Sequence, residues 1–188
     1  MKKTIKEFAE IRSGLFLKPQ ERGDLVYLQA KFFDSEGRLN GSVFPDVKRH
    51  EVPEKHLLKP GEILFSAKGW KNFATVYEEK NSPAVASTSF LVISLVNDYI
   101  LPDFLAMWLN SPDMRDTLKN MAKGTSIPSI TKAQLSELKV PVFPLETQRR
   151  LLRLNSLKRE EKNILDKIYI LKSLKLDLNI KKVLNRYE

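Results

Sequence analysis

Residues 67–72, AKGWKN, gather side chain types that could contact a nucleic acid. The two lysines can meet phosphates, the asparagine can pair bidentately with adenine, and the tryptophan can stack on a base or wedge between bases. A hairpin tip of this composition is also common in proteins with other functions, where the tryptophan simply packs, so both interpretations stay open. The candidate DNA-binding residues of this stretch are Lys68, Gly69, Trp70, Lys71 and Asn72.

A second candidate group offers small donors and a backbone that a ligand can approach closely. It consists of Lys123, Gly124, Thr125 and Ser126, although helix termination explains the glycine equally well. Four further candidates follow strand-like segments and are also typical of an ordinary surface. They are Arg38, Asn40, Lys48 and Arg49.

Catalysis and metal binding find little support in the residue types. His50 and His56 are six residues apart, which matches neither one helix face nor a familiar zinc pattern, so we interpret both as surface histidines. The chain has no Cys, no glycine-rich phosphate loop, no Gly-x-Ser-x-Gly and no Asn-Pro-Pro-Tyr or Asp-Pro-Pro-Tyr segment. We therefore expect no catalytic residue, no metal site and no cofactor.

Composition predicts one ordinary domain with an appendage. The 188 residues are 42% apolar, which is enough for a core. The N-terminus is charged, no run of 18 apolar residues occurs, and the absence of Cys fits a reducing compartment, so we expect a soluble cytoplasmic protein.

The net charge of +9 favours a polyanionic partner, most often a nucleic acid. Residues 145–188 hold 12 Lys and Arg against 6 Asp and Glu, a net of +6, which leaves +3 for residues 1–144. A solvated, lysine-rich helix face would explain this excess equally well.

The first hundred residues are predicted to be mostly β. Strands are expected at 24–33, 59–69, 73–79 and 84–96, and residues 34–41 have the composition of a turn.

Helices follow. Pro102 suits the first turn of a helix that reaches Asn110, and Ser111-Pro112 predicts the N-cap and first residue of another that stops at Gly124. Thr131 to Gln134 fits a capping box for a short helix. The two prolines of residues 139–144 restrict that segment to a sheet edge or exclude it from a sheet.

Residues 145–188 are predicted to form one long helix with a seam of apolar side chains. The seam has a seven-residue spacing that Glu161 and Lys175 interrupt. A helix of roughly 40 residues would be about 60 Å long, longer than the domain is wide, so we expect most of it to project and to bind another chain, a second copy above all. Packing of the helix back onto its own domain is the alternative. The seam residues are Leu154, Leu157, Ile164, Ile168, Leu171, Leu174 and Leu178.

These patterns predict an α+β fold. We expect a mixed β-sheet domain with short helices at residues 1–144 and one long, coiled-coil-type helix at residues 145–188.

The order of elements resembles one target-recognition domain and the following spacer helix from the specificity (S) subunits of Type I restriction-modification enzymes. The most specific match is an I-x-x-I stretch, a short helix, an apolar-Pro segment and a Gln that opens the helix. The resemblance covers about residues 55–185, and the first 50 residues match only loosely. The matching segments are residues 58–69, 84–93, 100–111 and 124–148, and the helix after them.

The resemblance implies a non-catalytic subunit that reads one half of a bipartite DNA sequence. Double-stranded DNA, methyltransferase subunits and in some cases a restriction subunit are the implied partners, with the helix as spacer and docking surface. Typical members carry two such sets in one chain, whereas this sequence has one set and no internal repeat.

A half-sized chain could form a homodimer through its helix and read a palindromic split site. It could instead pair with another half-subunit, or be a truncated remnant or an engineered half. Two other classes stay open: a stand-alone dimeric DNA-binding regulator and a coiled-coil protein-interaction adaptor. A steep fall of affinity with salt would separate DNA readers from the adaptor, and co-purification with a methyltransferase would separate the S subunit from the regulator.

Overall fold

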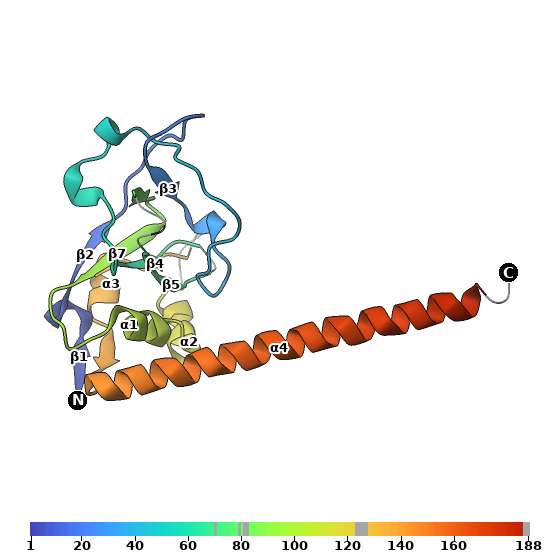
Figure 1. Ribbon diagram of the computed structural model, residues 1–188. Coiled ribbons are helices and arrows are strands. Elements are labelled where there is room, and N and C mark those ends of the chain that lie inside the picture. The colour runs from blue at the N-terminus through green and yellow to red at the C-terminus, as the bar shows by residue number, and fades with distance from the viewer. Residues whose placement is uncertain (70, 79, 81–82, 123–127, 186–188) are drawn as a thin grey trace. The chain divides into compact units, whose positions relative to one another are not determined.

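The computed structural model describes residues 1–69, 71–78, 80, 83–122 and 128–185 (Figure 1). By its internal contacts the chain divides into two compact units, Met1–Gln148 and Arg149–Glu188. The first unit carries the sheets and the short helices, and the second consists of most of one long helix.

A four-stranded antiparallel sheet forms the centre of the first unit, with the strand order β2-β7-β4-β5 (Figure 1). Its two middle strands are runs of Phe, Leu, Ile and Val that are buried along most of their length, as central strands require. The strand bounds are β2 Ala9–Ser13, β7 Phe90–Leu95, β4 Ile63–Ser66 and β5 Ala74–Val76.

Two smaller sheets complete the β structure. β3 (Val26–Leu28) and β6 (Ala84–Ala86) pair in parallel, and β1 (Lys2–Thr4) pairs antiparallel with β8 (Lys139–Pro141). Parallel and antiparallel pairs occur together, so the predicted mixed β domain is confirmed. The proline-containing segment takes the edge position that was expected of it.

Short helices connect these strands. Pro102 and Pro112 occupy the first turns of α1 and α2 as predicted, although Ser111 makes no side-chain cap hydrogen bond. The capping box is confirmed: the Gln134 N–H donates to Thr131 Oγ1 at 3.2 Å, and the Thr131 N–H donates to Gln134 Oε1 at 2.9 Å. The α-helices are α1 Pro102–Leu109, α2 Pro112–Met121, α3 Lys132–Ser136 and α4 Leu145–Leu184, and the 3-10 turns are η1 Ile5–Glu7, η2 Ala30–Phe32, η3 Arg49–Glu51 and η4 Glu54–His56.

The strand predicted at 84–96 is in fact two strands that join different sheets. The break falls at Ser87–Ser89, where the two serine hydroxyls are 2.6 Å apart. Gly14 passes so close that a Cβ there would lie 2.1 Å from the Ser87 carbonyl oxygen. This backbone crossing is a non-local constraint, and the apolar run alone could not predict it.

One other expectation needs correction, two strands were not predicted, and one predicted helix end is untested. The strand predicted at 24–33 is limited to β3, because the chain turns into η2 immediately after it. The sequence also gave no signal for β1 and β2. Helix α2 ends at Met121 with Ala122 as its C-cap, and the predicted stop at Gly124 lies outside the described residues.

The β3–β6 sheet separates two apolar clusters. Side chains alternate along a strand, and accordingly Val26 and Leu28 join one cluster while Leu25 and Tyr27 join the other. The first cluster continues onto the central sheet through a set of aromatic and aliphatic side chains, Leu64, Phe73, Phe90 and Val92.

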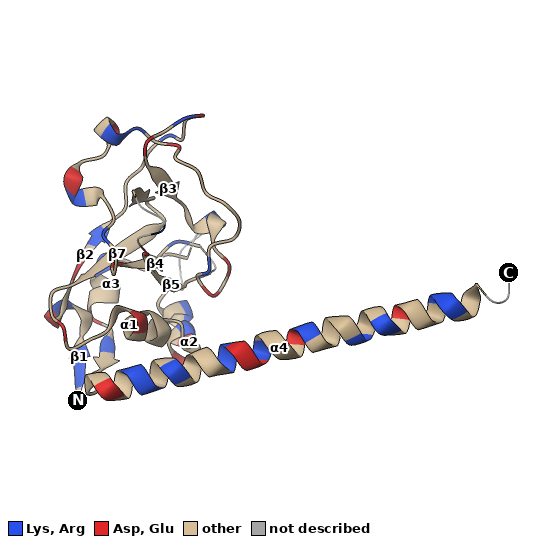
Figure 2. Ribbon diagram, viewed as in Figure 1, with Lys and Arg blue, Asp and Glu red and all other residues tan. Residues whose placement is uncertain are grey.

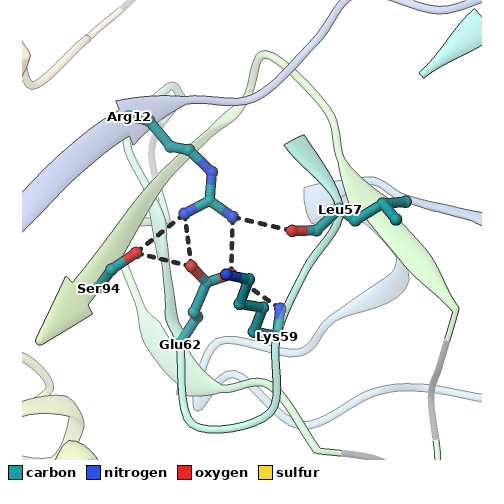
Figure 3. Close-up of polar contacts among 5 residues, drawn as sticks. All are labelled: Arg12, Leu57, Lys59, Glu62 and Ser94. Carbon is teal, nitrogen blue, oxygen red and sulfur yellow. Dashed lines mark hydrogen bonds and ion pairs between the residues drawn. The ribbon is translucent and has the colours of Figure 1, made fainter. Parts of the chain in front are cut away.

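A largely buried ion pair connects the edge strand β2 with the turn before β4 (Figure 3). Glu62 is 7% exposed, and its two carboxylate oxygens accept from the Arg12 guanidinium at 2.5 and 2.6 Å. The Ser94 hydroxyl donates to the same carboxylate at 2.6 Å and the Lys59 N–H at 2.9 Å, while Arg12 also donates to the Leu57 carbonyl at 3.2 Å. The cluster therefore ties β2, β7 and the turn before β4 together.

Burial by itself raises the pKa of the Glu62 carboxyl. The hydrogen bonds from Arg12, Ser94 and the Lys59 N–H outweigh that effect, together with the charge of Arg12, so the pKa lies below the ordinary value for glutamate. A group with a lowered folded-state pKa stabilises the protein above its unfolded pKa, and this contribution is lost as the pH falls through the folded value.

We predict that Glu62→Ala lowers the free energy of unfolding by about 3 kcal/mol near neutral pH, because it leaves the Arg12 charge without its partner. The difference from the wild type should shrink as the pH falls below the ordinary pKa of glutamate. Urea denaturation across this pH range measures both effects. Glu10→Ala, at an exposed position of β2, is the control, and an equal loss in both variants would contradict the prediction.

Candidate nucleic-acid interface

The predicted DNA-binding stretch forms the tip of the β4–β5 hairpin. The Ser66 N–H donates to the Phe73 carbonyl at 2.8 Å, and the Asn72 side-chain amide donates to the Ser66 carbonyl at 2.9 Å. Lys68 and Lys71 are exposed, whereas Asn72 is partly buried by its contact with the hairpin backbone. Trp70 lies outside the described residues.

The hairpin tip is paired with the segment that follows the second candidate group. Lys68 and Ser129 form an antiparallel bridge, in which the Gly69 N–H donates to the Pro128 carbonyl and the Ile130 N–H to the Ala67 carbonyl, each at 2.8 Å. Gly69 has a positive φ of 94°, which glycine adopts without strain. The second group itself, Lys123, Gly124, Thr125 and Ser126, lies outside the described residues.

Asn110, at the C-cap of α1, fixes the outer edge of β5. Its side-chain oxygen accepts from the Ala74 N–H at 2.9 Å, and its amide donates to the Ala74 carbonyl at 2.7 Å. These bonds occupy backbone groups that an edge strand would otherwise leave unpaired. Sequence reasoning missed this residue, because a helix-terminal asparagine gives no signal of the strand that it contacts.

Residues 34–41 form a turn that packs against β5. Asp34 Oδ1 accepts from the Glu36 and Arg38 N–H groups at 2.8 and 2.9 Å. Gly37 lies so close to β5 that a Cβ there would be 3.0 Å from the Ala74 carbonyl oxygen. The turn that carries two candidate residues is thus adjacent to the hairpin that carries the main group.

The two candidates of this turn differ in their surroundings. The Arg38 side chain is 50% exposed, and its guanidinium forms ion pairs with Asp34, at 3.2 Å, and with Glu36. Asn40 is exposed, and its N–H donates to the Phe32 carbonyl at 2.7 Å. Arg38 would have to exchange intramolecular partners in order to contact DNA, whereas the side chain of Asn40 is accessible.

The remaining candidates lie elsewhere. Lys48 precedes η3 and Arg49 begins it, and Figure 1 shows that turn at the top of the view, well separated from β5. Arg49 donates to the Val52 carbonyl at 2.8 Å and forms an ion pair with Glu54. The structure therefore gives the Arg49 guanidinium an internal role in holding the η3–η4 segment.

Metal-ligand clusters and membrane-spanning helices are both absent from the described part of the chain. No group of three or more His, Asp or Glu residues there could hold a metal ion. None of the described helices has both the length and the apolar character needed to cross a bilayer.

Helix α4 spans 40 residues, as the long apolar repeat predicted. All seven predicted seam residues are between 42% and 64% exposed, and other large apolar side chains of the helix are exposed as well. Lysine and arginine recur between them along the helix (Figure 2).

The chain thus has the architecture of a mixed β domain with short helices, continued by a long helix that exposes leucine and isoleucine. The family model of the Type I restriction modification DNA specificity domain matches residues 1–168. The chain belongs to this family.

Solved structures of low sequence identity share the fold. The HsdS subunit from Thermoanaerobacter tengcongensis has a TM-score of 0.61 and 17% identity over 86% of this chain and 37% of its own. The S subunit of a Type I restriction-modification system from M. genitalium has a TM-score of 0.56 and 18% identity over 91% of this chain and 43% of its own.

A structure concerned with complex assembly and conformational transition of the type I R-M system has a TM-score of 0.56 and 17% identity over 86% of this chain and 38% of its own. This chain therefore spans about two fifths of the length of the structures that it matches. No curated protein matches it in sequence.

We predict that Lys68→Ala combined with Lys71→Ala flattens the salt dependence of binding to duplex DNA. Loss of two phosphate contacts should reduce the slope of log K against log[salt] by about 1.8. Fluorescence anisotropy with a labelled duplex at several salt concentrations measures this slope. The matched control is Lys18→Ala with Lys55→Ala, two exposed lysines of other loops. An unchanged slope in the hairpin variant would place the phosphate contacts elsewhere.

Proposed function

We propose that this chain is the DNA-reading subunit of a Type I restriction-modification enzyme, in which residues 1–144 recognise one half-site. The observation that carries this proposal is the bridge between Lys68 and Ser129. It joins the hairpin tip to the segment after α2, so two loops that are distant in sequence contribute to one surface. Sequence-specific readers present donors and acceptors on loops that a rigid scaffold positions.

The composition of this surface fits a division between phosphate and base contacts. Lys68 and Lys71 are exposed, as phosphate contacts require. Asn72 has one amide hydrogen committed to the Ser66 carbonyl, but a carboxamide has a second hydrogen and an oxygen, which are the groups that pair with adenine. The hydrogen bond to Ser66 would orient that amide before DNA arrives.

We propose that the chain performs no chemistry itself and that a methyltransferase subunit modifies the DNA. The family is a DNA specificity domain, and the sequence has none of the nucleophile or methyltransferase motifs considered above. Catalysis would then depend on recruitment of the methyltransferase to the site by this chain.

Residues 145–188, most of which form helix α4, are proposed as the spacer and docking segment, and a second copy of the chain as its first partner. The exposed seam residues support this assignment, because such a large apolar surface is normally covered in a soluble protein. Two identical readers joined through a two-fold axis would recognise a split site with matching halves. A methyltransferase subunit that covers the same seam is the competing arrangement.

The function is tested by co-expression with the methyltransferase subunit of the same restriction-modification system and mapping of methylated bases by long-read DNA sequencing. We expect methylation at a bipartite motif whose two halves are related by a palindrome. Cells that lack this chain are the control and should show no such motif. Unmethylated DNA, or a continuous asymmetric motif, would contradict the proposal.

We predict that Ile164→Asp combined with Leu171→Asp converts a dimer into a monomer, because it places charges in the apolar seam. Light scattering of the purified chain measures the mass. The control is Asn163→Asp with Ser173→Asp, which adds the same charge at polar positions of α4. A wild-type chain that is already monomeric would show that another subunit covers the seam.

A further inference from the structure

The turn at residues 34–41 is held from two sides. Gly37 rests on β5, as described above, and Arg115 reaches it from α2. Arg115 Nη2 donates to the Ser35 carbonyl at 3.1 Å, across 80 residues of sequence. One side chain of α2 therefore connects the helix with the turn that carries Arg38 and Asn40.

The remaining contacts of Arg115 are few. Its Nε is buried and has no hydrogen-bond partner among the described residues, and no ion pair there involves this guanidinium. An arginine can donate five hydrogen bonds. In the described part of the chain the guanidinium is thus oriented by a single acceptor, the Ser35 carbonyl, so the position of the turn and that of the arginine depend on each other.

The turn is closed by its own hydrogen bonds. Besides the two bonds to the Asp34 carboxylate, the Asp34 N–H donates to the Arg38 carbonyl at 2.9 Å. Phe33 and Leu39 form an antiparallel bridge, which closes the turn at its base. A contact at Ser35 is therefore transmitted to Arg38 and Asn40, which lie three and five residues further along.

We propose that Arg115 is a positioning residue for DNA recognition: by holding the Ser35 carbonyl it keeps Asn40 on the same surface as the β4–β5 hairpin. The proposal rests on the proposed function of residues 1–144 as a DNA reader. It assigns the turn at residues 34–41 to that surface as a third segment. Arg115 acts through the turn, and Asn40 makes the contact with DNA.

The test is a double-mutant cycle in the full chain, with binding measured on a duplex that contains the methylation-mapped site. Arg115→Met retains the length of the side chain and removes its donors. We expect Arg115→Met and Asn40→Ala each to reduce affinity roughly 5- to 150-fold, as loss of a base contact does. The double variant should lose no more affinity than the single variant with the larger loss, because both changes remove the same contact. The proposal would be overturned if the two losses of affinity multiply in the double variant, or if Arg115→Met binds the duplex as tightly as the wild type.

A matched control uses the same helix. Lys119 lies one turn after Arg115, is exposed, and is 3.9 Å from Asp116 in a surface ion pair. Lys119→Met should combine multiplicatively with Asn40→Ala, since nothing in the described structure connects Lys119 with the turn.

Hydrogen exchange of the free protein separates this proposal from the DNA-reading function. The Glu36 and Arg38 amides, which donate to Asp34, should exchange faster in Arg115→Met, while amides of β4 and β7 remain protected. Unchanged exchange in the turn would overturn the positioning role even if DNA binding is normal. A different outcome is that exchange accelerates in the variant while the wild-type chain does not bind the mapped site. In that case Arg115 does hold the turn, but the proposed function is wrong, and so is the assignment of the turn to DNA recognition.

Discussion

The side-chain amide of Gln148, which is 0% exposed, joins the start of the long helix to the domain before it. Its oxygen accepts from the Leu101 N–H at 2.9 Å, and its nitrogen donates to the carbonyls of Tyr99 and Phe143 at 2.7 and 2.8 Å. This one residue therefore joins the loop before α1, the segment before α4 and the first turn of α4. A buried amide is tolerated only when its groups are paired, so this position ties the identity of the residue to the local fold.

The two units differ in what stabilises them. Up to Gln148 the chain is stabilised by its own core, with the buried Arg12–Glu62 pair inside the central sheet. Beyond it, no large apolar side chain of the described helix is fully buried, and most of them are exposed. A helix in water gains most of its stability from packing of an apolar face. Order in the second unit is thus expected to increase when a partner binds.

Local signals predicted the elements that local chemistry determines. Pro102, the Thr131–Gln134 box and the apolar repeat of α4 act within a few turns, and each was predicted correctly. The break at Ser87 was missed because its cause, Gly14, is more than seventy residues away. The same holds at the candidate site: residue types indicated the hairpin tip, but its pairing with Ser129 and the contact of Arg115 with Ser35 depend on tertiary structure. The sequence predicted candidate DNA-binding loops, but the fold is needed to show which of these loops are adjacent.

The pairing of β1 with β8 also dictates when the domain can be completed during synthesis. Residues 2–4 are synthesised well before their hydrogen-bonding partners, residues 139–141. At typical translation rates the first strand waits on the order of 10 s for the last. Gln148 follows within a second or two, so the recognition domain closes just before the long helix emerges. Most of the apolar helix is therefore synthesised after every residue of the first unit, which favours folding of that unit before the helix can meet another unfinished chain.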